Sequence, residues 1–151
     1  MDIVFRRAVM ADLPSLLALL AEDVLGAQRE SLAAPLHEQY AEALRDILAQ
    51  QGNQILLGLS GDEIVAMLQL TFIPGLAHQG ARRAQIEAVR VKGSVRGQGI
   101  GKRLFAQAIA LSREAGCAMV QLTTDRRRED AIRFYEALGF QPTHVGMKLP
   151  L

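Results

Sequence analysis

The sequence contains a single cysteine, Cys117, so no disulfide can form within the chain. Such scarcity is typical of proteins in a reducing compartment and predicts a cytoplasmic location. No apolar run approaches the roughly 20 residues of a membrane-spanning helix. The first residues, MDIVFRRAVMADL, also lack the basic-then-apolar order of a signal peptide. We therefore expect neither a membrane span nor a secretory leader.

An excess of charge of one sign is also missing. The chain has 17 lysines and arginines against 16 aspartates and glutamates, a net charge of +1. This balance gives no electrostatic reason to expect binding to nucleic acid or to an acidic membrane. The histidines, His37, His78 and His144, are scattered, and no cluster with carboxylates or Cys117 has metal-ligand spacing. We expect no nucleic-acid partner, no membrane partner and no metal site.

What the chain does have is enough apolar sequence for one core. Half of its 151 residues are hydrophobic, and no linker or repeat divides it, so we expect one domain over residues 1–151. Apolar periodicity predicts strands and helices in a mixed order. The expected strands are 3–9, 53–60, 63–73, 84–91, 117–124 and 143–149, and the expected helices are 11–24, 34–52, 100–112 and 130–140. This order predicts an α/β or α+β sheet with helices on both faces.

Four of these segments carry more detailed expectations. Residues 117–124, CAMVQLTT, form a nearly continuous apolar strand of the kind buried in the middle of a sheet. Residues 143–149, THVGMKL, predict a final strand, and Asp12 is expected to cap the first helix. The connection 25–33, LGAQRESLA, is rich in small residues and is expected to move or to line a site, and 74–83 reads as a loop.

Three glycines, Gly97, Gly99 and Gly101, alternate where a strand turns into a helix, flanked by Arg96 and Lys102. Glycines permit positive φ and remove Cβ atoms, so backbone N–H groups at a helix N-terminus can converge on one anion. The segment therefore predicts a phosphate or pyrophosphate site. It is neither a Walker loop nor a dinucleotide fingerprint, because the spacing of its glycines fits neither pattern. RGQGIG, residues 96–101, matches the pattern [QR]-x-x-G-x-[GA] in full.

These motifs resemble the GNAT superfamily of acyl-CoA-dependent N-acyltransferases. IEAVRVKGSVRGQGIGKRLF, residues 86–105, resembles its strand–pyrophosphate-loop–helix motif, and AIRFYEALGF, residues 131–140, resembles its second signature. Residues 120–140 look most similar to small bacterial enzymes such as the aminoalkylphosphonate acetyltransferases. One departure is Arg128, which stands where many relatives have an asparagine that contacts the cofactor.

The resemblance implies a mixed, mostly antiparallel sheet whose strands through Val91 and from about Ala118 splay to form a slot for acetyl-CoA. Backbone N–H groups from Gly97 to Lys102 would cradle the pyrophosphate, and Val89 and Val91 would pair with the pantetheine arm. The implied cofactor-binding residues are Val89, Arg90, Val91, Arg96, Gly97, Gln98, Gly99, Ile100, Gly101 and Lys102.

Two side chains are candidates for catalysis. Glu87 lies within an apolar strand, where it is either a general base for the incoming ammonium or a partner in a salt bridge to Arg90 or Arg83. Strict alternation places it on the face of Val89 and Val91, unless a β-bulge breaks that parity. Tyr135 is either a core aromatic or, as the resemblance implies, a hydroxyl aimed at the departing CoA sulfur.

The sequence thus favours an N-acetyltransferase in which a primary amine of a small molecule attacks acetyl-CoA directly, without a covalent acyl-enzyme. Two alternatives stay open: an enzyme that acetylates protein N-termini or lysines, and an acyl-CoA-binding module without catalysis. Dimers are common among similar proteins, so a homodimer is one expectation for the assembly.

Overall fold

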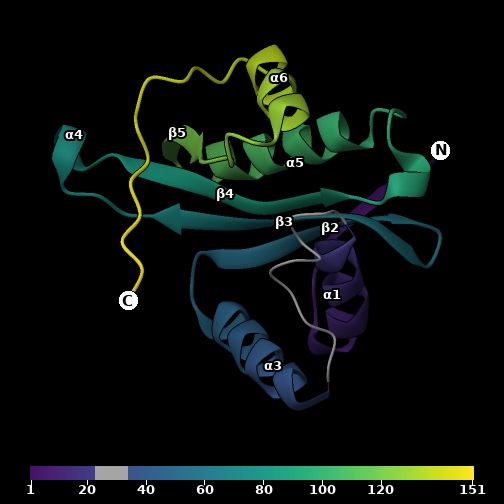
Figure 1. Ribbon diagram of the computed structural model, residues 1–151. Helices are drawn as coiled ribbons and strands as arrows, with labels where there is room; N and C mark the ends of the chain where they lie inside the picture. Colours follow the sequence, from purple (N-terminus) through teal and green to yellow (C-terminus); the bar gives the residue numbers. More distant parts are fainter. Residues whose placement is uncertain (23–33) are drawn as a thin grey trace.

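The computed structural model describes residues 1–22 and 34–151, and among these residues five strands form one sheet (Figure 1). Its order is β1-β2-β3-β4-β5, with the first four strands antiparallel and β5 parallel to β4. The strands are β1 Val4–Arg7, β2 Asn53–Ser60, β3 Glu63–Ile73, β4 Arg82–Val91 and β5 Cys117–Leu122. This confirms the expected mixed, mostly antiparallel sheet.

Helices cover both faces of the sheet, as expected (Figure 1). α1 Leu13–Ala21 and α3 Ala34–Ala49 lie on one face, over a cluster that includes Leu16, Leu44 and Met67. α5 Ile100–Glu114 and α6 Glu129–Ala137 lie on the other face. There Leu104 and Phe105 of α5 are fully buried. The alternation of β3 sends Met67 to the first cluster and Leu68 to the second, so one strand serves both layers.

The last expected strand is not formed. Residues 141–151 continue from α6 as an extended arm, and residues 144–151 make no backbone hydrogen bond with any other described residue. A strand needs a neighbour for its N–H and C=O groups, and the arm runs along no strand edge in the described structure. The expectation for 117–124 is also corrected, because β5 is the outermost strand and the side chain of Met119 is 50% exposed.

Smaller differences concern turns and short helices. The loop 74–83 contains a four-residue helix, α4 Ala77–Gly80, and single 3-10 turns form at η1 Met10–Asp12 and η2 Gly93–Val95. Asp12 does not cap α1 with its side chain. The connection 25–33 lies outside the described residues. No helix in the described ranges is long and apolar enough to cross a membrane.

Candidate active site

β4 and β5 pair over only part of their length, and we call the region where they part the β4–β5 slot. Their parallel register runs from Arg82 opposite Cys117 to Ile86 opposite Leu122. β5 ends there, whereas β4 continues to Val91 without a partner on that side among the described strands. The expected splay is therefore present, and residues 87–91 of β4 border the slot without a strand partner on that side.

A β-bulge in β4 sets the direction of the side chains beside this slot. Glu87 lies opposite Gln69 and Arg90 lies opposite Met67, so three steps on β4 face two steps on β3. The additional residue is accommodated at Ala88, whose φ of 52° is unusual for a residue with a Cβ. Such strain persists where the surrounding structure imposes it and is common at functional sites.

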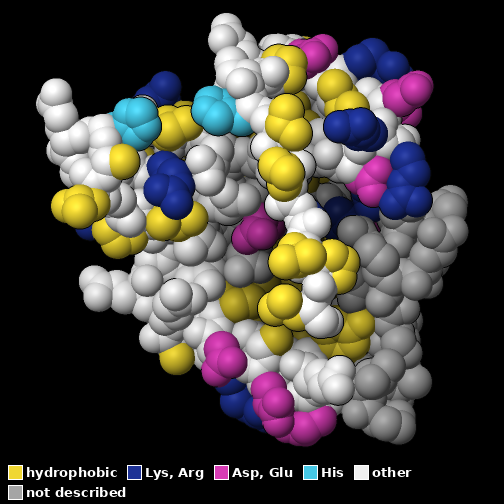
Figure 2. Space-filling model, turned by 60° about the vertical axis from the view of Figure 1, so that its left-hand side comes forward, with side chains coloured by type: hydrophobic (Ala, Val, Ile, Leu, Met, Phe, Trp, Pro, Cys, Tyr) yellow, Lys and Arg dark blue, Asp and Glu magenta, His cyan; other side chains and the backbone are white. Residues whose placement is uncertain are grey.

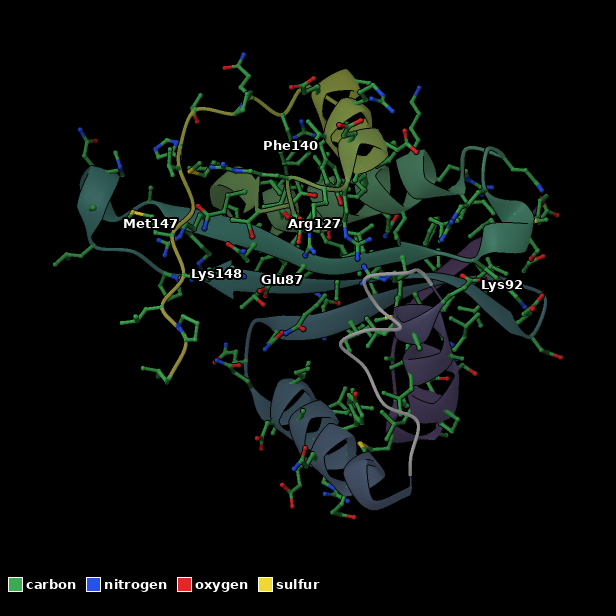
Figure 3. The ribbon with its side chains drawn as sticks, in the orientation of Figure 1. Glu87, Lys92, Arg127, Phe140, Met147 and Lys148 are labelled. Carbon is green, nitrogen blue, oxygen red and sulfur yellow. The ribbon has the colours of Figure 1, made fainter. Side chains whose placement is uncertain are left out.

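The bulge reverses the parity that strict alternation would give. Glu87 and Arg90 oppose Gln69 and Met67 and therefore point to the face covered by α1 and α3. Val89 and Val91 pack instead with the cluster beneath α5. Glu87 is thus separated from the two valines, and Figure 3 shows it near the middle of the sheet. Its side chain is solvent-exposed.

Glu87 does not form the salt bridges that the sequence offered as an alternative. Among the described residues, no cationic nitrogen lies within 4.0 Å of its carboxylate, so neither Arg90 nor Arg83 pairs with it. Arg90 instead donates from Nη1 to the carbonyl of Val89 at 2.7 Å. An exposed carboxylate at a slot, without a cation beside it, is available to accept a proton from a ligand or a water molecule.

The glycine segment has the form of an anion cradle. Gly97 and Gly99 have φ of 78° and 77°, and a Cβ built on either would meet nothing within 4 Å. Gly99 stands at the N-cap of α5. Within the described chain, none of the N–H groups of residues 97–102 donates to a backbone or side-chain acceptor. These donors and the positive end of the helix dipole are therefore available to an anion such as a phosphate.

Gly101 has a different role from the other two glycines. A Cβ there would lie 3.3 Å from Cζ of Phe134 and 3.6 Å from Cγ2 of Val91. Its missing side chain therefore lets α5 approach both α6 and the end of β4. Ile100 beside it is buried and anchors the first turn in the core.

The flanking charges are exposed, and one of them has a partner. Arg96 donates from Nε to the carbonyl of Val91 at 3.1 Å, and its Nη2 lies 4.0 Å from a Glu22 oxygen. Gln98 and Lys102 are exposed on the loop and the first helical turn. All three residues flank or belong to the glycine loop.

Glu22 is a residue that the sequence analysis missed. It ends α1, and its carboxylate accepts hydrogen bonds from the N–H of Gly93 at 3.0 and 3.1 Å. A Cβ on Gly93 would approach Glu22 Oε1 to 3.3 Å, which explains the glycine. Glu22 thus holds the entry to the cradle against α1. The contact joins positions 71 residues apart, and no local pattern indicates it.

Tyr135 sits in an aromatic cluster on the α6 side of the slot. Its ring centroid lies 5.6 Å from those of Phe105 and Phe134 and 6.1 Å from that of Phe140. Burial raises the pKa of the Tyr135 hydroxyl, and the charges of Arg90 and Arg128 offset part of that rise. Among the described residues the hydroxyl has no hydrogen-bond partner, so it is free to donate to a ligand.

Comparisons with known proteins agree with this geometry. A model of the acetyltransferase (GNAT) family matches residues 20–140. Among solved structures, a transcriptional regulator from Bacillus halodurans C-125 is 45% identical with a TM-score of 0.95, over 99% of this chain and 100% of that one.

Two curated relatives are enzymes that acetylate amines, by their names. An aminoalkylphosphonate N-acetyltransferase of Salmonella typhimurium is 35% identical over 88 residues, 58% of this chain and 56% of that protein. A glucosamine 6-phosphate N-acetyltransferase of Trypanosoma brucei brucei is 36% identical over 88 residues, 58% of each chain. The chain therefore spans a little over half the length of these relatives. The family match covers most of the sequence, including the cradle and Tyr135, and the chain belongs to the acetyltransferase (GNAT) family.

Proposed function

We propose that this protein is an N-acetyltransferase that moves an acetyl group from acetyl-CoA to a primary amine of a small molecule. The observation that carries the proposal is the row of N–H groups of residues 97–102, which have no acceptor among the described residues and lie at the N-terminus of α5. A pyrophosphate fits such a cradle, and an extended arm fits a slot between splayed strands.

Acetyl-CoA supplies, when bound, an acetyl group activated as a thioester. The cradle would hold its pyrophosphate, with Arg96 and Lys102 adding positive charge. The pairing of Arg96 with Glu22 is loose at 4.0 Å, so a phosphate can compete for the guanidinium. Val89 and Val91 would offer backbone groups to the pantetheine arm, and an N–H near the bulge would polarise the carbonyl as an oxyanion hole does.

Glu87 would act as the general base, directly or through a water molecule. An amine must lose a proton before its nitrogen can attack a carbonyl carbon, and at neutral pH it is mostly an ammonium. Glu87 is exposed at the slot, and no described cation competes for its carboxylate. The bulge turns it toward the α1 and α3 side, so the acceptor would enter from that side of the sheet.

Tyr135 would stabilise the leaving thiolate from the α6 side. Because burial raises its pKa, the phenol stays protonated at neutral pH and can donate a hydrogen bond to sulfur. Full proton transfer would be uphill, since the thiolate of a thiol with an ordinary pKa near 8.5 is a weaker base than a phenolate, so a hydrogen bond is enough. In this proposal, proton removal and leaving-group stabilisation come from opposite faces of the sheet.

The names of the two curated relatives support a small-molecule acceptor. One is named for an aminoalkylphosphonate and the other for glucosamine 6-phosphate, and both acceptors are small amines that carry an anionic group. We infer a small primary amine as the acceptor of this protein as well.

A second candidate function is supported by the Bacillus halodurans relative, which is called a transcriptional regulator. A domain of this family that binds acyl-CoA without turnover would serve as a sensor of that ligand. In such a module the cradle would be kept, whereas Glu87 and Tyr135 would have no chemical role.

A screen for thiol release separates these candidates. Purified protein is incubated with acetyl-CoA and a panel of small amines with and without phosphate or phosphonate groups, and of lysine-containing peptides. Free CoA thiol is followed, and products are identified by mass. Turnover with small amines is the expected result. Turnover of peptides alone would indicate a protein acetyltransferase, and tight binding of acetyl-CoA without any turnover would indicate the sensor.

A further inference from the structure

The sheet face that carries Glu87 is covered by an apolar layer over β2 and β3, whereas the β4 side of the same face is polar. The buried cluster beneath α1 and α3 includes residues of β2 and β3 but none of β4 or β5. On β4 this face presents Arg83, Gln85 and Glu87, which alternate with buried residues of the opposite face. Gln121 of β5 lies beside Gln85 in the strand register. We call these four residues, Arg83, Gln85, Glu87 and Gln121, the polar strip.

The middle of the polar strip keeps hydrogen-bonding groups that a ligand can use. Nε2 of Gln121 donates to Oε1 of Gln85 at 2.7 Å. This bond leaves the amide nitrogen of Gln85 and the amide oxygen of Gln121 without a partner among the described residues. The polar side chains next to the strip on β3 are occupied, because Gln69 and Thr71 both donate to Oδ1 of Asn53. The strip therefore offers both a donor and an acceptor, and its neighbours on β3 do not compete for them.

Arg83 is the cation of the polar strip. It is half-buried, and among the described residues its guanidinium has neither a hydrogen bond nor a carboxylate within 4.0 Å. A Cβ on Gly75 would lie 3.4 Å from Nη1, so the guanidinium rests beside the β3–β4 loop. Arg82 differs, because it donates from Nη1 to the carbonyl of Ala115 at 3.0 Å, at the end of α5. Arg83 is thus available for the paired hydrogen bonds that a guanidinium gives to a carboxylate or phosphate.

The two ends of the strip carry opposite charges. Regular pairing with β3 continues from Glu87 to Arg83, so their Cα atoms lie about 13 Å apart, too far for a direct ion pair. In Figure 2, where the left-hand side of Figure 1 comes forward, an acidic side chain is set back near the middle of the view and basic side chains lie apart from it. A strip with a carboxylate at one end and a guanidinium at the other is complementary to a molecule with an ammonium and an anion.

We propose that Arg83 binds an anionic group of the acceptor, so that this protein acetylates primary amines that also carry a phosphonate, phosphate or carboxylate. The amine would lie at Glu87, the anion at Arg83, and the amides of Gln85 and Gln121 beside the chain that joins them. Arg83 would then determine specificity without taking part in the chemical step. The inference rests on the proposed function and deepens it by naming the class of acceptor.

Kinetics with matched acceptors test the role of Arg83. Aminoalkylphosphonates of two to six carbons are each paired with the amino alcohol of the same length, which lacks the anion. For the best phosphonate, Arg83→Gln should raise KM by roughly 10- to 150-fold, the range for hydrogen bonds to a charged group, with kcat nearly unchanged. KM for the amino alcohol should not change. Arg83→Lys should restore part of the loss, because it keeps the charge but not the paired geometry.

Arg82→Gln is the matched control, since it removes a neighbouring guanidinium from the opposite face and should leave KM for both acceptors as in the wild type. Circular dichroism confirms that the variants are folded. If Arg83→Gln leaves KM for the phosphonates unchanged, or raises KM for both acceptors equally, the proposal is overturned.

A binding measurement separates this inference from the proposed function. An aminoalkylphosphonate is titrated by calorimetry into protein saturated with CoA, so that the glycine loop is not open to the phosphonate. The wild type and Arg82→Gln should bind alike, and Arg83→Gln should bind at least about tenfold more weakly. Binding that depends on Arg83 without turnover of any amine would refute the acetyltransferase and keep the anion site. Turnover of amines whose binding is indifferent to Arg83, or no binding of any aminoalkylphosphonate, would overturn the anion site.

Discussion

Glu87 and Tyr135 lie on opposite faces of the sheet. Glu87 points to the side of α1 and α3 because of the bulge at Ala88, and Tyr135 belongs to the aromatic cluster under α6. In the proposed reaction, a proton is removed from the incoming amine while negative charge collects on the departing sulfur. Groups on opposite faces can serve these two needs without meeting each other, which makes their contributions separable by mutation.

Glu87→Gln tests the role of the base. The variant should lower kcat/KM at neutral pH by about 10²–10⁴-fold, as the loss of a general base does. The deficit should shrink as the pH approaches the ordinary amine pKa of about 10.4, where the acceptor loses its proton unaided. Steady-state pH profiles of both proteins measure this. Glu114→Gln, an exposed change at the end of α5, is the control, and a deficit independent of pH would leave Glu87 with a structural role only.

Tyr135→Phe removes one hydroxyl and keeps the aromatic cluster. A hydrogen bond to a charged partner is worth about 1.5–3 kcal/mol, so kcat should fall by roughly 10- to 150-fold. Affinity for acetyl-CoA should hardly change, which a calorimetric titration checks. If affinity falls and kcat does not, Tyr135 binds the donor and the thiolate is stabilised by another group.

The pH dependence of kcat should also carry the signature of Tyr135. Its pKa is raised above the ordinary value of 10, first by burial, so the protonated phenol persists throughout the usual assay range. In the wild type, kcat should therefore show no decline that is attributable to tyrosine ionisation below about pH 10. A descending limb near pH 8 that disappears in Tyr135→Phe would contradict the raised pKa.

At the scale of elements, the loop before α5 is the feature on which the proposed binding of acetyl-CoA rests. Gly99→Val adds a side chain in the cradle and should lower acetyl-CoA affinity by at least about tenfold, or roughly 1.4 kcal/mol. Because φ of Gly99 is 77°, valine there would also strain the backbone and should lower the free energy of unfolding by about 1–2 kcal/mol. Calorimetry measures the affinity, and urea unfolding measures the stability.

Gly116→Val is the control that distinguishes the effect of backbone strain from the effect of losing contact with acetyl-CoA. Gly116 ends α5 with φ of 78°, and a Cβ there also meets nothing within 4 Å. The two variants should therefore lose similar stability, whereas only Gly99→Val should lose acetyl-CoA affinity. Equal affinity in both variants would mean that the cradle does not hold the donor.

The turn from β4 into α5 could be predicted from the sequence because its determinants are local. Gly97 and Gly99 adopt positive φ, and their spacing before a helical pattern is visible in ten residues. The β2–β3 hairpin is equally local, with Gly61 at φ 59° in its turn. The splay followed from the family resemblance, and the structure confirms it.

Features that depend on contacts between residues far apart in the chain could not be predicted from the sequence. The position of the bulge at Ala88 depends on pairing with β3, so the sequence alone did not determine to which face of the sheet Glu87 points. Glu22 reaches Gly93 only once α1 packs on the sheet. The strand predicted over residues 143–149 is not formed, because a strand pattern does not say which distant edge it would pair with, and these residues pair with no described strand. In physical terms, local conformation was predictable, and partners of high sequence separation were not.

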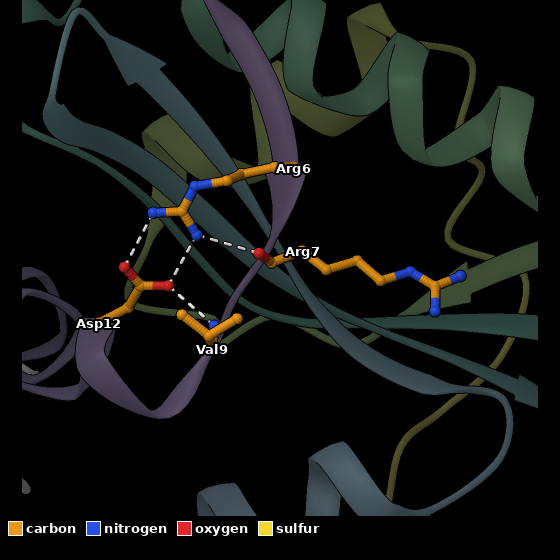
Figure 4. Close-up of polar contacts among 4 residues, drawn as sticks. All are labelled: Arg6, Arg7, Val9 and Asp12. Atoms are coloured by element: carbon orange, nitrogen blue, oxygen red, sulfur yellow. Dashed lines mark hydrogen bonds and ion pairs between the residues drawn. The ribbon is translucent and has the colours of Figure 1, made fainter.

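At the scale of the whole molecule, one ion pair joins the first strand to the first helical layer. Arg6 of β1 donates to both carboxylate oxygens of Asp12, at 2.7 and 2.9 Å, and the N–H of Val9 donates to the same carboxylate at 2.8 Å (Figure 4). Asp12 is only 9% exposed, which limits the competition from water. The hydrogen bonds from Arg6, followed by that from Val9, hold the pKa of Asp12 below its usual range against the opposing effect of burial.

Asp12→Asn should therefore lower the free energy of unfolding by about 1.5–3 kcal/mol at neutral pH, the range for hydrogen bonds to a charged group. A carboxyl whose pKa is depressed by folding stabilises the native state above its unfolded pKa of about 3.9, and that stabilisation is lost as the pH falls through the folded value. The difference between wild type and variant should thus be constant from neutral pH to about pH 5 and shrink in more acidic solution. Urea unfolding at a series of pH values measures it, with Asp62→Asn at the β2–β3 turn as a control. As Asp12 becomes protonated, its carboxyl and the amide of the variant become similarly poor partners for Arg6, so the difference in stability should shrink. A difference in the free energy of unfolding that persists undiminished at pH 2 would show that Asp12 acts through the shape of its side chain and not through its charge.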